Sequence, residues 1–318
     1  MHDIVTNSTD IRRPLNSFHR KRGVDVIHCV CHRLALILSD AIKGTKAYDP
    51  VIPDAVINLL NWLHTYFAKS PKRKNALRKL IDNKNRNLRE ERTRGEVEGR
   101  RFPLPLLPVR NPDDDLDEVL KVLEERHKLP RRVVLTRWLS SADAVKVVVT
   151  SRDTYTQFFS FEQSEKAERI CALLEDNSIM AWYPCLQDVL PVLTTLNVLF
   201  QSAKPLPHLL HRHIVAAKRT LVEMVGTRCA EREGLMPLES IKHDTPFGAY
   251  ANRFLSECSG ATGTPTYGTR LSEAQVLVLK KQWHKFFTHC VVQIDERFPP
   301  ESCELFELLQ GMHILYIH

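Results

Sequence analysis

The sequence predicts a mainly α-helical protein. Apolar residues recur at the three- and four-residue spacing of amphipathic helices over much of the chain. Glycine is scarce, with 11 among 318 residues, which argues against an enzyme built around glycine-rich, phosphate-binding turns. We expect about nine helices and two short strands.

The composition is that of a soluble protein inside the cell. Hydrophobic residues make up 43% of the chain and charged residues 26%, as in ordinary globular domains. Eight cysteines without regular spacing predict reduced thiols in a nuclear or cytosolic protein. The polar, basic N-terminus has no apolar core, and no apolar run approaches the length of a membrane span. We therefore expect no association with a membrane.

The first structured segment follows an irregular lead-in over residues 1–23. Residues 24–41 change from a β-type apolar run to a helical one, which predicts a strand feeding a helix. His28, Cys29, Cys31 and His32 crowd this junction. Free cysteines are commonly buried, so a packed strand end explains them. A zinc site is less favoured, because the sequence offers no second cysteine pair, and we predict no metal.

Residues 24–94 are predicted to form one unit that ends in a basic helix. The preceding helix, from Asp54, has an apolar face made of Val56, Leu59, Leu60, Leu63, Tyr66 and Phe67. Ser70 is placed to cap the basic helix and Pro71 to begin it.

The net positive charge of the protein is concentrated in and just after the basic helix. Residues 69–101 hold thirteen Lys and Arg against five Asp and Glu, while the formal net charge of the chain is +7. This predicts about 3–6 phosphate contacts on duplex DNA. The alternative is a solvated helix face without a partner. The predicted contacts are Lys69, Lys72, Arg73, Lys74, Arg78 and Lys79.

A proline-rich linker is predicted over residues 95–112, followed by a helical unit over residues 113–318. Asp113, Asp114 and Asp115 open that unit, where a helix dipole explains them more simply than a metal site. A short strand then precedes a long helix from about Ser140. Residues 226–271 are predicted to be irregular. Further helices are expected over Gln163–Leu174, Ile179–Phe200, Leu206–Val225 and Ser272–Gln293.

Four motifs occur in one order along the chain: HCVCHRLAL at 28–36, KSPKR at 69–73, TRWLS at 136–140 and ERFP at 296–299. Together they resemble the central portion of hAT-family DNA transposases, and most closely their domesticated zinc-finger relatives. The resemblance implies a long helical insertion in a ribonuclease-H-like catalytic fold. Residues of about 24–42 would be a strand–helix remnant of the catalytic fold, and most later residues would be the insertion.

The resemblance also implies roles for two residue pairs. Cys29 and His32 have the spacing of the family's C-x-x-H motif, and Arg137 and Trp138 match its Arg-Trp pair. In similar transposases the tryptophan holds a base swung out of the duplex, which implies DNA contact for Trp138. The alternative is that Trp138 is the apolar anchor of the helix beginning at Leu139.

Catalysis in this family requires three carboxylates that hold two metal ions. The first has no counterpart here, Asp3 and Asp10 are weak candidates for the second, and the third falls near or beyond the last residue. The family's zinc finger and dimerisation segment are also expected to be absent.

We therefore expect a truncated, transposase-derived, non-catalytic nuclear protein with residual sequence-independent DNA binding and no cofactor. Two alternatives stay open. One is an active Mg²⁺-dependent nuclease or strand transferase completed by another chain. The other is a decayed transposon fragment without a selected role.

Overall fold

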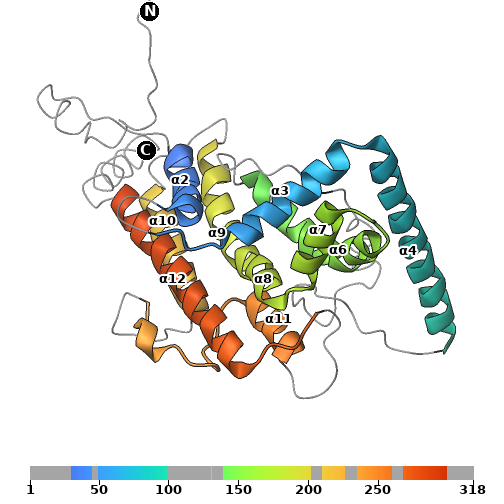
Figure 1. Ribbon diagram of the computed structural model, residues 1–318. Helices are drawn as coiled ribbons and strands as arrows, with labels where there is room; N and C mark the ends of the chain where they lie inside the picture. Colours follow the sequence, from blue (N-terminus) through green and yellow to red (C-terminus); the bar gives the residue numbers. More distant parts are fainter. Residues whose placement is uncertain are drawn as a thin grey trace, which may run out of the picture.

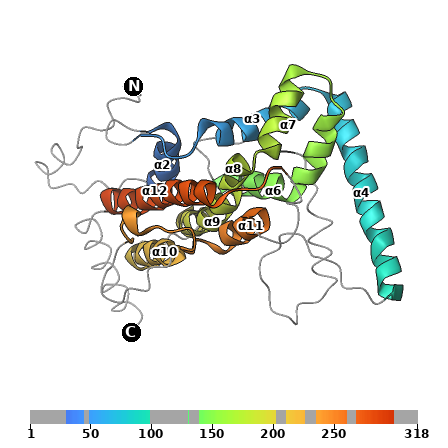
Figure 2. The same ribbon diagram turned by 60° about the horizontal axis from the view of Figure 1, so that its bottom comes forward.

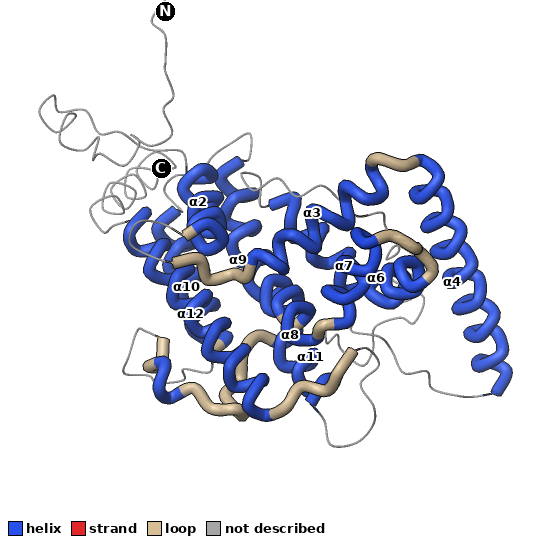
Figure 3. The backbone as a smooth tube through the Cα atoms, in the orientation of Figure 1, coloured by secondary structure: helices blue, strands red, loops and turns tan. Residues whose placement is uncertain are grey.

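The computed structural model describes residues 30–44, 49–98, 130, 139–201, 210–225, 235–259 and 268–298. Within these ranges every regular element is a helix (Figures 1 and 3), so the mainly α prediction is confirmed. The predicted strands, the aspartate run and most of the proline-rich linker lie outside the described residues. The helices are α2 (Val30–Lys43), α3 (Asp54–Ala68), α4 (Pro71–Glu98), α6 (Leu139–Ser160), α7 (Glu165–Glu175), α8 (Asn177–Met180), α9 (Trp182–Gln201), α10 (Leu210–Met224), the 3-10 helix η2 (Leu238–Ser240), α11 (Ala249–Ser259) and α12 (Glu273–Arg297).

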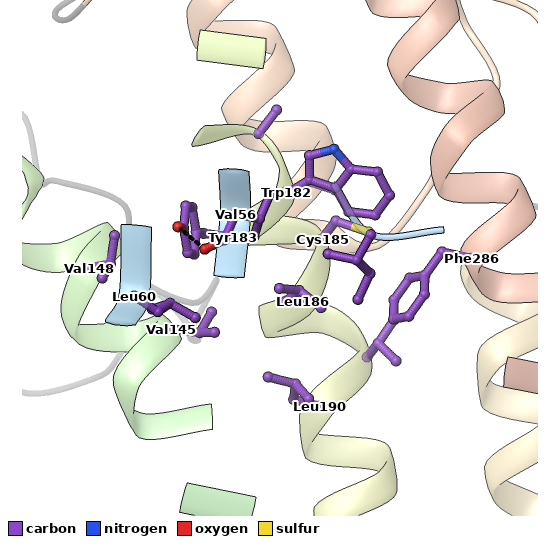
Figure 4. Close-up of a cluster of buried hydrophobic side chains, with 14 of the residues drawn as sticks. Val56, Leu60, Val145, Val148, Trp182, Tyr183, Cys185, Leu186, Leu190 and Phe286 are labelled. Atoms are coloured by element: carbon purple, nitrogen blue, oxygen red, sulfur yellow. Dashed lines mark hydrogen bonds between the residues drawn. The ribbon is translucent and has the colours of Figure 1, made fainter. Parts of the chain in front are cut away.

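Helix α9 is the centre of the fold. It packs against α2, α6, α8, α10 and α11. Its first turn is wholly buried, and the hydroxyl of Tyr183 donates to the backbone carbonyl of Val56 in α3 at 2.7 Å (Figure 4). The Trp182 ring meets Phe286 of α12 edge to face, with the ring centroids 6.1 Å apart. Helices distant in sequence therefore share one core around α9.

The predicted apolar face of α3 is confirmed, because all six of its residues are buried. The β-branched run in α6 is helical despite its low helix propensity, since Val145, Val147 and Val148 are buried in the core. Ser272 caps α12 in a capping box with Gln275, where the sequence placed the start of that helix.

The structure corrects three boundaries. Residues predicted to be irregular include α11, which buries Phe254 and Leu255. The helix predicted from Ile179 is divided at Ala181 into α8 and α9. Helix α4 continues through Gly95 to Glu98, four residues into the predicted linker, because i to i+4 backbone bonds there outweigh the cost of one glycine.

Among the described helices, none combines the length and the apolar character needed to cross a bilayer.

Candidate nucleic-acid interface

Helix α4 attaches to the body along one narrow apolar edge. Leu77 is 0% exposed, Ile81 is buried, and Leu80 packs partly against the same core. These residues lie against α3 and α6. Figures 1 and 2 show α4 at one end of the molecule, with its later turns extending beyond the other helices. The rest of its circumference is therefore open to solvent along much of its length.

The start of α4 has the predicted capping arrangement. The Ser70 hydroxyl accepts a hydrogen bond from the Arg73 backbone N–H at 3.3 Å, and Pro71 is the first helical residue. Proline is well suited to this position, because its missing N–H would have no helical partner there. The KSPKR motif thus has a structural role as a helix start.

Two of the basic side chains of α4 are held by the protein itself. The Arg73 guanidinium lies over the Tyr66 ring, 4.1 Å from its centroid, and 3.8 Å from the Glu162 carboxylate. The Tyr66 hydroxyl donates to the same carboxylate at 2.6 Å, and burial is the main reason that the pKa of Tyr66 is raised. Lys84 pairs with Asp153 of α6. Arg73 and Lys84 therefore help fix α4 to the body.

The face of α4 opposite its buried edge carries exposed hydrogen-bond donors in a straight row. We call this row the outer stripe, and its members are Lys72, Asn75, Lys79, Asn83 and Arg86. Their spacing of i, i+3, i+7, i+11 and i+14 places them on one helix face. Arg86 is nine residues from buried Leu77, half a turn out of phase. At 1.5 Å per residue the outer stripe is about 21 Å long.

The net positive charge of α4 lies in the first part of the helix. Residues 71–86 contain seven Lys and Arg and a single Asp, whereas residues 87–98 contain three Arg and four Glu. The electrostatic attraction for an anion is therefore strongest along the outer stripe. The cationic surface is shorter than the segment from Lys69 to Arg101 that the sequence suggested.

The six predicted contact residues do not share one face. Lys72 and Lys79 lie on the outer stripe, and Arg78 is exposed beside it. Lys69 is exposed at the C-terminal cap of α3, Lys74 is half-buried, and Arg73 contacts Tyr66. Asn75, Asn83 and Arg86 were not predicted as contacts. The seven-residue spacing of Lys72, Lys79 and Arg86 is the signal that could have identified the stripe.

The other predicted site residues fall largely outside the described part of the chain. These residues are Asp3, Asp10, Cys29, Arg137 and Trp138. His32 is described, and it is exposed in the first turn of α2. Across the described residues, no group of three or more His, Cys, Asp and Glu side chains is arranged to hold a metal ion.

The first and last family-like motifs meet in space. Arg33 of α2 donates to the backbone carbonyl of Arg297, and its guanidinium lies 5.6 Å from the centroid of the Phe298 ring. Arg297 in turn donates to the Asp40 carboxylate. Nearby, the His289 ring approaches the Ile37 carbonyl at 3.1 Å, and burial lowers the pKa of His289. We call this the α2–α12 joint.

A buried carboxylate that the sequence did not reveal supports α11. Asp188 of α9 accepts hydrogen bonds from the backbone N–H groups of Tyr250 and Ala251, at 3.1 and 2.9 Å. Burial raises the pKa of Asp188 to about 6, although these hydrogen bonds act in the opposite direction. Gly248 is required beside it, because an added Cβ would lie 2.2 Å from the Asp188 Cγ. The carboxylate thus caps a helix from a distant part of the chain.

The described cysteines are packing groups. Cys171, Cys185, Cys258 and Cys290 are all free thiols. Burial raises the pKa of Cys258 to about 11 and that of Cys185 well above its ordinary value. A thiolate is the reactive form of cysteine, so burial disfavours that form at Cys258 and Cys185.

Comparisons with protein-family models, with curated proteins and with solved structures found no match to this chain.

Proposed function

We propose that this protein binds duplex DNA without sequence preference through the outer stripe of α4. The observation that carries the proposal is the row of Lys72, Lys79 and Arg86, exposed on the face of α4 that points away from the core. Lysine and arginine that neutralise phosphates release condensed counterions, and this supplies most of the affinity in non-specific binding. Asn75 and Asn83 add amide donors between the cations.

The dimensions of α4 favour a duplex partner. An α-helix with its side chains is about 10–12 Å across, and the major groove of B-form DNA is about 12 Å wide. The outer stripe contains no aromatic side chain, whereas proteins that bind single strands rely on aromatic rings to stack the bases. A straight cationic stripe therefore fits the regular phosphate rows of a duplex better than it fits a single strand.

The proposed activity is binding alone. The outer stripe offers ammonium, guanidinium and amide groups and no carboxylate. Such groups position phosphates but do not assemble the metal pair that a ribonuclease-H-like nuclease uses. We therefore propose a non-catalytic nuclear protein related to hAT-family transposases, as the order of the four motifs suggested.

The α2–α12 joint supports the idea that the helical body is an inserted domain. An inserted domain must begin and end at nearby points, so that the host fold is not pulled apart. Here Arg33 in the first turn of α2 contacts Arg297 in the last turn of α12. We propose that α2 belongs to the remnant of a ribonuclease-H-like fold and that the helical insertion, which follows it, returns to that remnant at the end of α12.

The test is binding of a fluorescein-labelled, 20-base-pair duplex, followed by anisotropy at low salt. In the stripe variant, Lys72, Lys79 and Arg86 are replaced with Gln. The control replaces Lys242, Lys281 and Lys285 with Gln, which removes the same charge from exposed positions on and near α12. Helix α12 lies far from α4 in Figures 1 and 2. We expect the stripe variant to bind at least about tenfold more weakly than the control on every duplex sequence.

Equal weakening in the two variants would show that net charge, not the outer stripe, determines binding. The same samples are incubated with Mg²⁺ and a supercoiled plasmid. No nicking is expected. Nicking that disappears in Asp3→Ala or Asp10→Ala would contradict the non-catalytic part of the proposal and favour a nuclease.

A further inference from the structure

An exposed carboxylate, Glu90, lies in line with the outer stripe just beyond its last residue. Glu90 is 18 residues after Lys72, and at 3.6 residues per turn this separation is five complete turns of the helix. The two side chains therefore leave α4 on the same side, about 27 Å apart along the helix axis. A straight row that begins with cations is thus followed by an anion.

Glu90 is the neighbour of Arg86, the last cation of the outer stripe. Residues four positions apart on a helix have Cβ atoms about 5–6 Å apart. A phosphate held by Arg86 would therefore lie close to the Glu90 carboxylate. The separation is shorter than the Debye length of about 8 Å at physiological salt, so the repulsion between the two anions is not screened out. Glu90 also attracts Arg86 and so competes with the phosphate for it.

The later turns of α4 are open in space but carry no excess of positive charge. Figures 1 and 2 show these turns extending beyond the other helices, where a duplex would have the most room. Residues 87–98 nevertheless contain three Arg against four Glu. Helix α4 has 28 residues and is about 42 Å long, whereas the outer stripe covers about 21 Å of it. Charge, and not access, therefore limits where phosphates can bind.

We propose that Glu90 ends the DNA-contact surface of α4, so that a bound duplex crosses the helix at the outer stripe and does not lie along its whole length. This inference rests on the proposed function. At 3.4 Å per base pair the outer stripe spans about six base pairs, whereas the whole helix could span about twelve. Glu90 determines which part of α4 accepts phosphates.

The test uses two substitutions of Glu90 and the salt dependence of binding to the labelled 20-base-pair duplex. Glu90→Gln removes the repulsion, and Glu90→Lys places a fourth cation in line with Lys72, Lys79 and Arg86. Glutamate, glutamine and lysine have similar helix propensities, so α4 is retained in both variants. The control is Glu273→Lys, which makes the same change of charge at an exposed position in the first turn of α12, far from α4 in Figures 1 and 2.

Glu90→Lys should steepen the slope of log K against log salt by about 0.9, the effect of one added phosphate contact. Glu90→Gln should bind about two- to threefold more tightly than wild type at low salt, because a carboxylate about 8 Å from a phosphate is removed. The slope in Glu273→Lys should stay within about 0.3 of the wild-type value.

The outcomes separate this inference from the proposed function. If Glu90→Lys steepens the slope no more than Glu273→Lys does, or if Glu90→Gln binds no more tightly than wild type, Glu90 does not limit the contact surface and the inference is wrong. The proposed function still stands in that case, provided that the stripe variant loses affinity. If the wild-type protein does not bind the duplex, the proposed function itself fails.

Discussion

Arg297 in the last turn of α12 donates a hydrogen bond to the carboxylate of Asp40 in α2, 257 positions earlier in the chain. The two side chains are only 19% and 14% exposed. An ion pair this well shielded from water is difficult to break, because each partner would be left in a poorly solvated position. The pair therefore ties the two ends of the described helical body together.

Arg297→Ala should lower the free energy of unfolding by about 1–3 kcal/mol, since Asp40 would lose a charged partner in a largely buried place. Urea denaturation followed by circular dichroism measures this. The control is Arg219→Ala, which removes an exposed pair with Glu223 on α10. Exposed pairs at i and i+4 contribute roughly 0.3–0.5 kcal/mol. A loss in Arg297→Ala no larger than in the control would show that the joint is not a stabilising contact.

Asp188 predicts a specific dependence of stability on pH. Its pKa in the folded protein is about 6, against an ordinary value of 3.8. The folded state therefore holds the proton more tightly, and the stabilising contribution of this group is complete below about pH 4 and lost as the pH rises to about 6.

The comparison variant is Asp188→Asn, which cannot titrate. Its stability is lower at every pH, because the NH2 group that replaces one of the two oxygens cannot accept from the backbone N–H group that faces it. The free energy of unfolding of the wild type minus that of Asp188→Asn should fall by about 1–3 kcal/mol between pH 4 and pH 7. A difference that is constant, or that rises over this interval, would contradict the assignment of a raised pKa.

Gly248→Ala should destabilise the protein by about 1–3 kcal/mol, because the new methyl group overlaps the Asp188 carboxyl. The same substitution made in an Asp188→Ser background should cost less, since the smaller side chain leaves room for the methyl group. A double-mutant cycle of urea midpoints measures the coupling. Strictly additive effects would mean that the two positions do not share this space.

Local sequence patterns were sufficient to predict several elements of the fold. The face of α3 follows a simple helical period, and Ser70 and Ser272 stand at recognisable helix starts. Helix α11 was missed because its first turn is capped by Asp188, 62 positions before Tyr250. A long-range partner of this kind leaves no signal in the neighbouring residues.

In the candidate site, too, the sequence predicted the local features but not those that depend on long-range contacts. Charge composition identified the basic segment, but it did not separate the exposed cations from Arg73 and Lys84, whose partners Glu162 and Asp153 lie on distant parts of the chain.

The measurement that tests the central claim most directly is the salt dependence of duplex binding. Each phosphate contact changes the slope of log K against log salt by about −0.9 on B-form DNA. With about 3–6 contacts, the wild-type slope should lie between about −2.7 and −5.4.

Replacing Lys72, Lys79 and Arg86 with Gln should make this slope shallower by about 2.7, equally on unrelated DNA sequences. The matched change of Lys242, Lys281 and Lys285 to Gln should leave the slope within about 0.5 of the wild-type value. An unchanged slope in the stripe variant would mean that the outer stripe of α4 is a solvated surface that does not contact DNA.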